Sequence, residues 1–240
     1  MHNWNDFSAF VWQVFFNKLK SKNFFMMLEA SKFCSALVVC VVILTGCSKD
    51  DAAGGSTALD FGPLTANSTW TYKNNPGSSF TVTATSRDTV AAGRKYRVLL
   101  NSSGSNLYLA KAGSAYYRFG SIADLGVAAV EELYLKDDQP VNATWQITQA
   151  FIAPGIPLPL TANLNYSIKE KGITRVVSGK TFNNVINVRL DLSIVGLGNI
   201  GGGNFYYAEG VGLIENAINV TVPGQAAISQ SQVLTAYSIK

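Results

Sequence analysis

Apolar and polar residues alternate one by one over much of the chain after residue 61. The alternation is clearest in the segments 80–85, 95–100 and 186–192, which are also rich in Val, Thr, Tyr and Phe. Successive side chains of a β-strand point to opposite faces, so a period of two predicts strands with one apolar and one wet face. Several such segments follow one another, and we therefore expect an all-β, antiparallel fold.

Turn-forming residues separate the alternating segments. Asn74–Gly77, Ala92-Gly93 and Ser178-Gly179 each stand between two of them and predict hairpin turns. Only the segment 122–132 has helical character, because Ala and Glu cluster there. That segment is the only helix candidate, and strand character returns directly after it, at 133–135.

Three short motifs occur twice in the same order, which suggests two related β-units. The paired segments are 67–70 with 142–145, 93–96 with 179–182, and 106–113 with 204–210. Two units are too few for a propeller or solenoid and favour a strongly curved sheet, either a half-closed barrel or a sandwich. Chance recurrence of such motifs in a β-rich sequence is the alternative.

An apolar run precedes these strands and ends in Leu44-Thr45-Gly46-Cys47. The run from residue 33 to 44 falls short of the roughly 20 residues that span a bilayer, but it has the length of a signal-peptide core with lysines before it. Translation begins at Met1, Met26 or Met27. We interpret 1–46 as a leader, 47–60 as a flexible tether and 61–240 as a single β domain.

The residues from Leu44 to Cys47 resemble a bacterial lipobox. The resemblance implies cleavage before Cys47, lipidation of its thiol and a membrane as partner. Lys49-Asp50-Asp51 resembles the acidic export tag of Bacteroidota lipoproteins, which implies the outer membrane, on the cell surface or facing the periplasm. Further motifs at 179–185 and 206–214 look like uncharacterised β-rich Bacteroidota lipoproteins, whose curved sheets are related in outline to lipocalins and lipoprotein carriers. That resemblance carries over no catalytic residue.

The composition after Cys47 limits the chemistry. His2 is the only histidine, and Cys34 and Cys40 lie in the leader, so the rest of the chain has no Ser-His-Asp or Cys-His nucleophile and no ordinary zinc site. From Cys47 onwards the chain has 15 Lys and Arg and 13 Asp and Glu, a net charge of +2. It therefore lacks the large excess of positive charge that is typical of nucleic-acid-binding proteins. We expect neither metal nor cofactor. A carboxylate pair acting as a glycoside hydrolase is the remaining enzyme alternative.

Gly196-Leu197-Gly198-Asn199-Ile200-Gly201 has the letters of a dinucleotide-binding fingerprint. A strand-like segment follows it where the fingerprint requires a helix. We interpret it as a flexible glycine-rich loop.

The candidate binding residues are apolar or aromatic. The segment 151–160 is apolar but contains three prolines, which prevent a central strand; it either covers a cavity mouth or packs as a cap. The candidate binding residues are Phe151, Ile156, Leu158, Tyr206 and Tyr207.

Asp88-Thr89-Val90 resembles an acceptor for O-glycosylation at Thr89.

These observations predict a non-enzymatic, lipid-anchored envelope protein that binds an unknown ligand or a protein or glycan partner. A lipocalin-like carrier of an apolar molecule is the alternative. A cavity lined by alternating side chains favours the carrier, whereas a filled core with exposed aromatic residues favours surface recognition.

Overall fold

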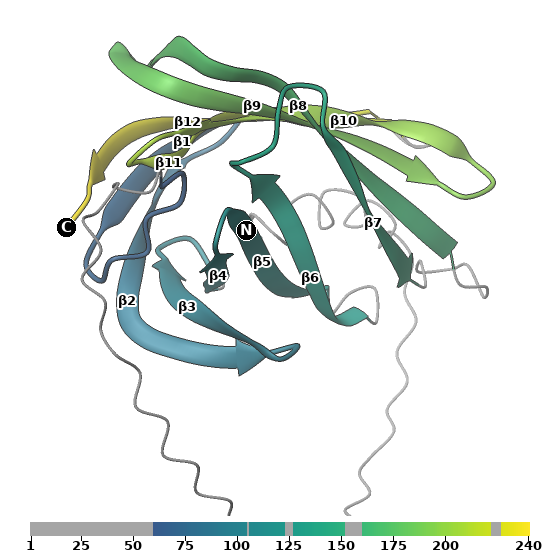
Figure 1. Cartoon of the computed structure of the whole chain (residues 1–240), viewed down its shortest axis with the longest axis horizontal. Coiled ribbons are helices and arrows are strands. Elements are labelled where there is room, and N and C mark those ends of the chain that lie inside the picture. The colour runs from purple at the N-terminus through teal and green to yellow at the C-terminus, as the bar shows by residue number, and fades with distance from the viewer. Residues whose placement is uncertain (1–59, 105, 123–126, 152–159, 222–226) are drawn as a thin grey trace, which may run out of the picture.

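The computed structural model describes residues 60–104, 106–122, 127–151, 160–221 and 227–240, and they form one antiparallel sheet of twelve strands (Figure 1). The strands are β1 (Thr69–Asn75), β2 (Ser79–Ala91), β3 (Arg94–Asn101), β4 (Leu107–Ala112), β5 (Ala115–Ile122), β6 (Val127–Lys136), β7 (Thr144–Phe151), β8 (Leu160–Val177), β9 (Lys180–Ile194), β10 (Gly198–Ala208), β11 (Gly212–Val220) and β12 (Ile228–Ser238). The all-β prediction is confirmed.

The sheet curls into a nearly closed barrel (Figure 1). Its strand order is β6-β5-β4-β3-β2-β1-β12-β11-β10-β9-β8-β7, so the first and last strands pair in the middle while β6 and β7 form the two edges. Because β6 and β7 are consecutive in the chain, the short connection between them holds the two edges of the curled sheet near each other. Strong curvature of this kind follows from the twist of long antiparallel strands.

The two β-units predicted from the sequence have the same local geometry. Asn67 and Asn142 both adopt a left-handed backbone, with φ of 68° and 70°. The amide of Asn67 donates to the carbonyl of Ala84 at 2.8 Å, and the amide of Asn142 donates to that of Ile168 at the same distance. Each unit therefore begins with the same turn, held to its own second strand.

The second strand of each unit also enters the third through the same hairpin. In the β2–β3 turn, Ala92 and Gly93 have φ of 48° and 77°, and in the β8–β9 turn Ser178 and Gly179 have φ of 49° and 76°. Two successive positive φ values are the mark of the tight hairpin turn that matches strand twist. The chain thus builds its sheet from two six-strand units, β1–β6 and β7–β12.

The interior holds two hydrophobic clusters. One is built mainly from β6 and β8–β11 and includes Ile168, Ile186 and Val188, all fully buried. The other is built mainly from β1–β3 and the β8–β11 region. Alternation in the sequence accounts for much of both clusters, but β9 is also buried at the adjacent residues Val185 and Ile186.

Two sequence-based predictions about secondary structure are wrong. The segment 122–132 is no helix: its described part belongs to β5 and β6, which pair with each other. Alternating burial of Val130 and Glu132 against the core outweighs the weak helical propensity of Ala and Glu.

The glycine-rich segment 196–201 is not simply a flexible loop, because β10 begins at Gly198 and pairs with β9 and β11. A Cβ atom at Gly202 would lie 2.0 Å from the carbonyl oxygen of Leu190, and one at Gly203 would lie 2.6 Å from that of Ala217. Glycine is required here for close approach between strands rather than for flexibility.

Candidate functional site: a cavity inside the sheet

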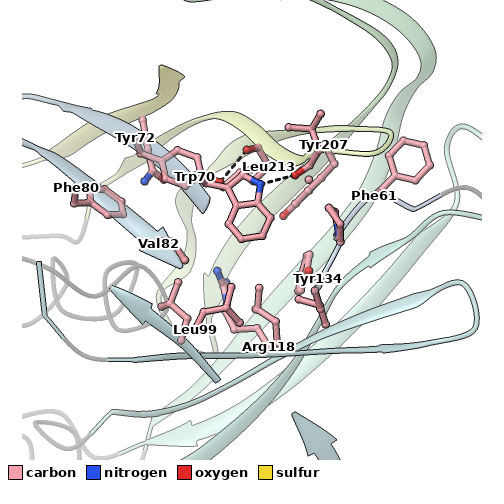
Figure 2. Close-up of a pocket in the computed structure, with 18 residues that line it drawn as sticks. Phe61, Trp70, Tyr72, Phe80, Val82, Leu99, Arg118, Tyr134, Tyr207 and Leu213 are labelled. Atoms are coloured by element: carbon pink, nitrogen blue, oxygen red, sulfur yellow. Dashed lines mark hydrogen bonds between the residues drawn. The ribbon is translucent and has the colours of Figure 1, made fainter. Parts of the chain in front are cut away.

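A cavity of about 100 Å³ lies inside the sheet (Figure 2). Half-buried Leu64, Leu109 and Leu213 are among the residues around it. The side chains and backbone that line it come from the segment before β1, from β1 to β6 and from β10 to β12: Phe61, Gly62, Pro63, Leu64, Trp70, Tyr72, Phe80, Val82, Leu99, Leu107, Leu109, Arg118, Tyr134, Tyr207, Val211, Gly212, Leu213 and Gln232.

The segment before β1 forms one wall of the cavity. Phe61 is fully buried, its amide donates to the Tyr116 hydroxyl at 3.0 Å, and the carbonyl of Asp60 accepts the amide of Gly210 at 2.6 Å. A Cβ atom at Gly62 would lie 3.0 Å from the Tyr116 ring, so glycine lets this segment lie flat against it. The predicted tether therefore leads directly into the cavity wall.

Aromatic side chains of β1 and β2 form a second wall (Figure 2). The Trp70 indole N–H donates to the carbonyl of Val211 at 2.7 Å, and the Tyr72 hydroxyl donates to that of Leu213 at 3.0 Å. Tyr72 also stacks on Phe80, with ring centroids 5.6 Å apart. The backbone satisfies these polar atoms, so the rings present apolar surface to the cavity.

A buried ion pair stands beside the cavity. Arg118 on β5 binds Glu132 on β6 through two parallel contacts, Nε to Oε2 at 3.0 Å and Nη2 to Oε1 at 2.7 Å, and both residues are 9% exposed. The Tyr166 hydroxyl also donates to Glu132. Burial by itself would lower the pKa of Arg118, but the Glu132 charge outweighs it and the pKa is raised. The guanidinium is therefore permanently charged and neutralised by its neighbour.

Two amides form the other buried polar group. Asn216 on β11 donates from Nδ2 to Oε1 of Gln232 on β12 at 2.8 Å, and the two residues are 1% and 3% exposed. Gln232 lines the cavity. This bond fixes the orientation of the Gln232 amide by occupying its oxygen, which leaves Nε2 as a donor.

The tyrosines of the cavity are neutral phenols. Burial raises the pKa of Tyr72, Tyr134 and Tyr207 well above the ordinary value of 10.0. Tyr134 and Tyr207 lie with ring centroids 5.5 Å apart. The cavity therefore has a neutral aromatic surface over the physiological pH range.

The structure separates two candidate residues that the sequence grouped together. Tyr207 lies in the cavity wall, but its neighbour Tyr206 points to the opposite face of β10, where the Arg175 guanidinium stacks on its ring with 3.4 Å to the centroid. Arg175 is in turn paired with Glu215 at 2.7 Å. The two tyrosines thus do not form one binding platform.

The remaining candidates lie elsewhere. Thr89 is on β2 at the β2–β3 hairpin, half-buried and paired with Tyr96. Phe151 ends β7, and its side chain is outside the described part. Cys47, Ile156 and Leu158 lie outside the described residues.

The sequence analysis did not identify Arg118 and Gln232, the two lining residues with polar, non-aromatic side chains. In the structure, Trp70 is a buried ring in the cavity wall. Alternation in the sequence shows that Trp70 and Tyr72 share one face of a strand. It does not show which faces of non-adjacent strands meet across the interior.

The carboxylates offer no acid–base pair at this cavity. Glu131 and Glu132 point to opposite faces of β6, where Glu131 binds Arg94 and Tyr96 while Glu132 binds Arg118. Within the described ranges, no three His, Cys, Asp or Glu side chains come together as a metal site would require. In the same residues, no helix is long and apolar enough to cross a membrane.

Comparisons with known proteins find two solved structures of partly similar fold. No protein-family model matches the chain, and no curated protein matches it. A presumed lipoprotein from Parabacteroides distasonis matches with a TM-score of 0.45 and 10% identity, over 76% of this chain and 100% of the other. A presumed exported protein with a YmcC-like fold from Bacteroides fragilis matches with a TM-score of 0.37 and 8% identity, over 73% of this chain and 97% of the other. Similarity at this level transfers neither a function nor a site.

Proposed function

We propose that this chain is a lipid-anchored protein of the bacterial cell envelope that binds a small apolar molecule inside its curled sheet. The cavity carries this proposal. Its walls are apolar and aromatic and belong to a sheet whose interior is otherwise filled by two packed clusters. An apolar cavity leaves its lining side chains short of contacts that a bound apolar molecule restores.

The size of the cavity limits the bound group. At about 100 Å³, it is somewhat smaller than the engineered cavities of about 150 Å³ that bind benzene. It suits a molecule of about six non-hydrogen atoms, or the apolar end of a larger one. This favours the carrier alternative of the sequence analysis over recognition on an exposed aromatic platform.

The two tryptophans after Cys47 provide a direct test of binding. Trp70 lies in the cavity wall, whereas Trp145 stacks on Tyr166 and is not part of it. Methylcyclopentane should shift the Trp70 indole N–H signal in a saturable way in nuclear magnetic resonance spectra of the lipidated protein in nanodiscs. The Trp145 signal should stay in place and serves as the internal control. If the two signals move in parallel, the probe is only partitioning into lipid and the proposal fails.

One substitution at two positions of β2 gives matched variants. Val82→Phe places a large ring where Val82, 4% exposed, lines the cavity, and should abolish the Trp70 shift. Val90→Phe changes a residue that is 73% exposed and should leave binding unchanged. Equal binding by both variants would place the probe outside the cavity.

The lipid anchor is the second part of the proposal, and the resemblance of Leu44–Cys47 to a lipobox supports it. Cys47→Ala should abolish metabolic labelling with a fatty acid, because no other thiol follows it in the chain. Protease treatment of whole cells should degrade the wild-type protein if it faces outward and spare it if it faces the periplasm. Persistent label in the variant would contradict the anchor.

A further inference from the structure

The polar side chains of the cavity determine which small apolar molecules it binds best. This inference rests on the proposed function. Among the residues that line it, only Arg118 and Gln232 carry polar side chains other than aromatic ones. Of the aromatic polar groups, those of Trp70 and Tyr72 donate to backbone carbonyls. Besides the hydroxyls of Tyr134 and Tyr207, the polar groups that face a ligand are therefore those of Arg118 and Gln232, and their existing bonds determine what they offer it.

The charge of Arg118 is already matched by Glu132. The two-point contact joins them at 3.0 and 2.7 Å inside the sheet, so the pair presents no net charge to the cavity. An anionic ligand would add an unpaired negative charge to a buried, low-dielectric site, and a cationic ligand would add an unpaired positive one. Both are disfavoured relative to a neutral molecule.

Gln232 presents a donor. Its Oε1 accepts the Asn216 amide at 2.8 Å, which orients Nε2 as the atom able to donate to a ligand. A ligand oxygen that meets Nε2 replaces the hydrogen bond to water that the ligand gives up on entering the cavity. A ligand with no acceptor gains apolar contact only.

We infer that the cavity selects a neutral, apolar molecule carrying one hydrogen-bond acceptor, such as a ketone, ester or alcohol oxygen, which Nε2 of Gln232 binds. Carboxylates of the same size are rejected. The neighbouring amide of Asn216 acts as a positioning residue, because it sets the orientation of Gln232 without touching the ligand.

Three probes with the same number of non-hydrogen atoms test the inference: methylcyclopentane, cyclopentanone and isobutyrate. Each is titrated into the lipidated protein in nanodiscs while the Trp70 indole N–H signal is followed. Cyclopentanone should bind about three- to tenfold more tightly than methylcyclopentane, the range expected for one net hydrogen bond. Isobutyrate should give no saturable shift. Equal affinity of ketone and hydrocarbon, or saturable binding of isobutyrate, overturns the inference.

Variants of the amide pair locate the acceptor site. Gln232→Met should remove the preference for cyclopentanone while keeping the affinity for methylcyclopentane. This change leaves the buried Asn216 amide without its acceptor. The double variant Asn216→Leu/Gln232→Met removes both amides, so it tests the same contact without a buried unpaired donor. Gln146→Met on exposed β7 is the control and should keep the preference. A preference that survives both Gln232 variants assigns the acceptor contact elsewhere and overturns the inference.

The two proposals fail in different ways. If methylcyclopentane shifts Trp70 but cyclopentanone binds no better, only the inference about the acceptor is wrong. If neither neutral probe shifts Trp70, the cavity does not bind small apolar molecules and the proposed function falls first.

Discussion

The indole N–H of Trp145 on β7 donates a 2.7 Å hydrogen bond to the backbone carbonyl of Leu133 on β6. These strands are the two edges of the sheet and share no backbone ladder in the described residues. Lys171 adds contacts from Nζ to the carbonyls of Asp137 and Gln139, at 2.6 and 3.1 Å. Side chains, rather than a twelfth set of strand-pairing bonds, therefore hold the seam of the barrel.

Trp145→Phe should loosen this seam. The variant keeps an aromatic ring for stacking on Tyr166 but loses the bond to Leu133, and the free energy of unfolding should fall by about 1 kcal/mol. Hydrogen exchange should speed up selectively in β6 and β7. Trp70→Phe is the matched control, because it loses an equally short bond away from the seam. Uniform acceleration in both variants would contradict a local role for Trp145.

Glu132→Gln should be strongly destabilising, because it leaves the buried Arg118 charge uncompensated. We expect a loss of about 3–5 kcal/mol in the free energy of unfolding, measured by denaturant titration. Asp191→Asn breaks the more exposed pair with Arg189 and should cost less than about 1 kcal/mol. Replacing both Arg118 and Glu132 by apolar residues should restore much of the loss. A Glu132→Gln protein as stable as Asp191→Asn would show that the pair is not buried in solution.

Stability should fall at alkaline pH. Burial raises the pKa of Tyr72, Tyr134, Tyr166 and Tyr207 above the ordinary 10.0, so above pH 10 the unfolded chain loses phenol protons that the folded chain retains. The stability is fully present below pH 10 and declines above it, by up to about 1.4 kcal/mol per pH unit for each group. Denaturant midpoints between pH 8 and about 11.5, with tyrosinate absorbance recorded in parallel, check this. A flat profile combined with early tyrosinate formation would mean that these rings are accessible.

Gly202→Ala should disrupt the pairing of β9 with β10. The new methyl group would lie 2.0 Å from the Leu190 carbonyl oxygen, and the strands have to separate, at a cost of about 2–3 kcal/mol in the free energy of unfolding. Gly113→Ala meets no atom within 4 Å and carries only the strain of its φ of 60°, about 1 kcal/mol. Thermal unfolding of both variants makes the comparison. Equal losses would show that backbone strain, not close packing, is what glycine relieves at position 202.

The sequence by itself determined the strands and the hairpin turns, and it suggested the two-unit organisation. These depend on local rules: alternation sets which side chains share a face, and residues such as Ala92-Gly93 set a turn wherever they occur. The rules failed at 122–132, where burial of Val130 and Glu132 against other strands overrides local propensity, and at 198–201, where β10 has already begun and a Cβ atom at Gly201 would lie 2.2 Å from the carbonyl oxygen of Asn219.

Only the tertiary structure decided where the cavity lies and what it presents. Trp70, Arg118 and Gln232 are far apart in the chain, and they meet because a twelve-stranded sheet curls until the inward faces of distant strands converge. How the sheet curls depends on the sum of many strand twists and on the side chains that close its seam, which no local pattern encodes. The pairing of Arg118 with Glu132 and of Gln232 with Asn216 likewise depends on strand register. For that reason the sequence indicated a sheet able to hold a ligand, while the structure supplied the chemistry of its interior.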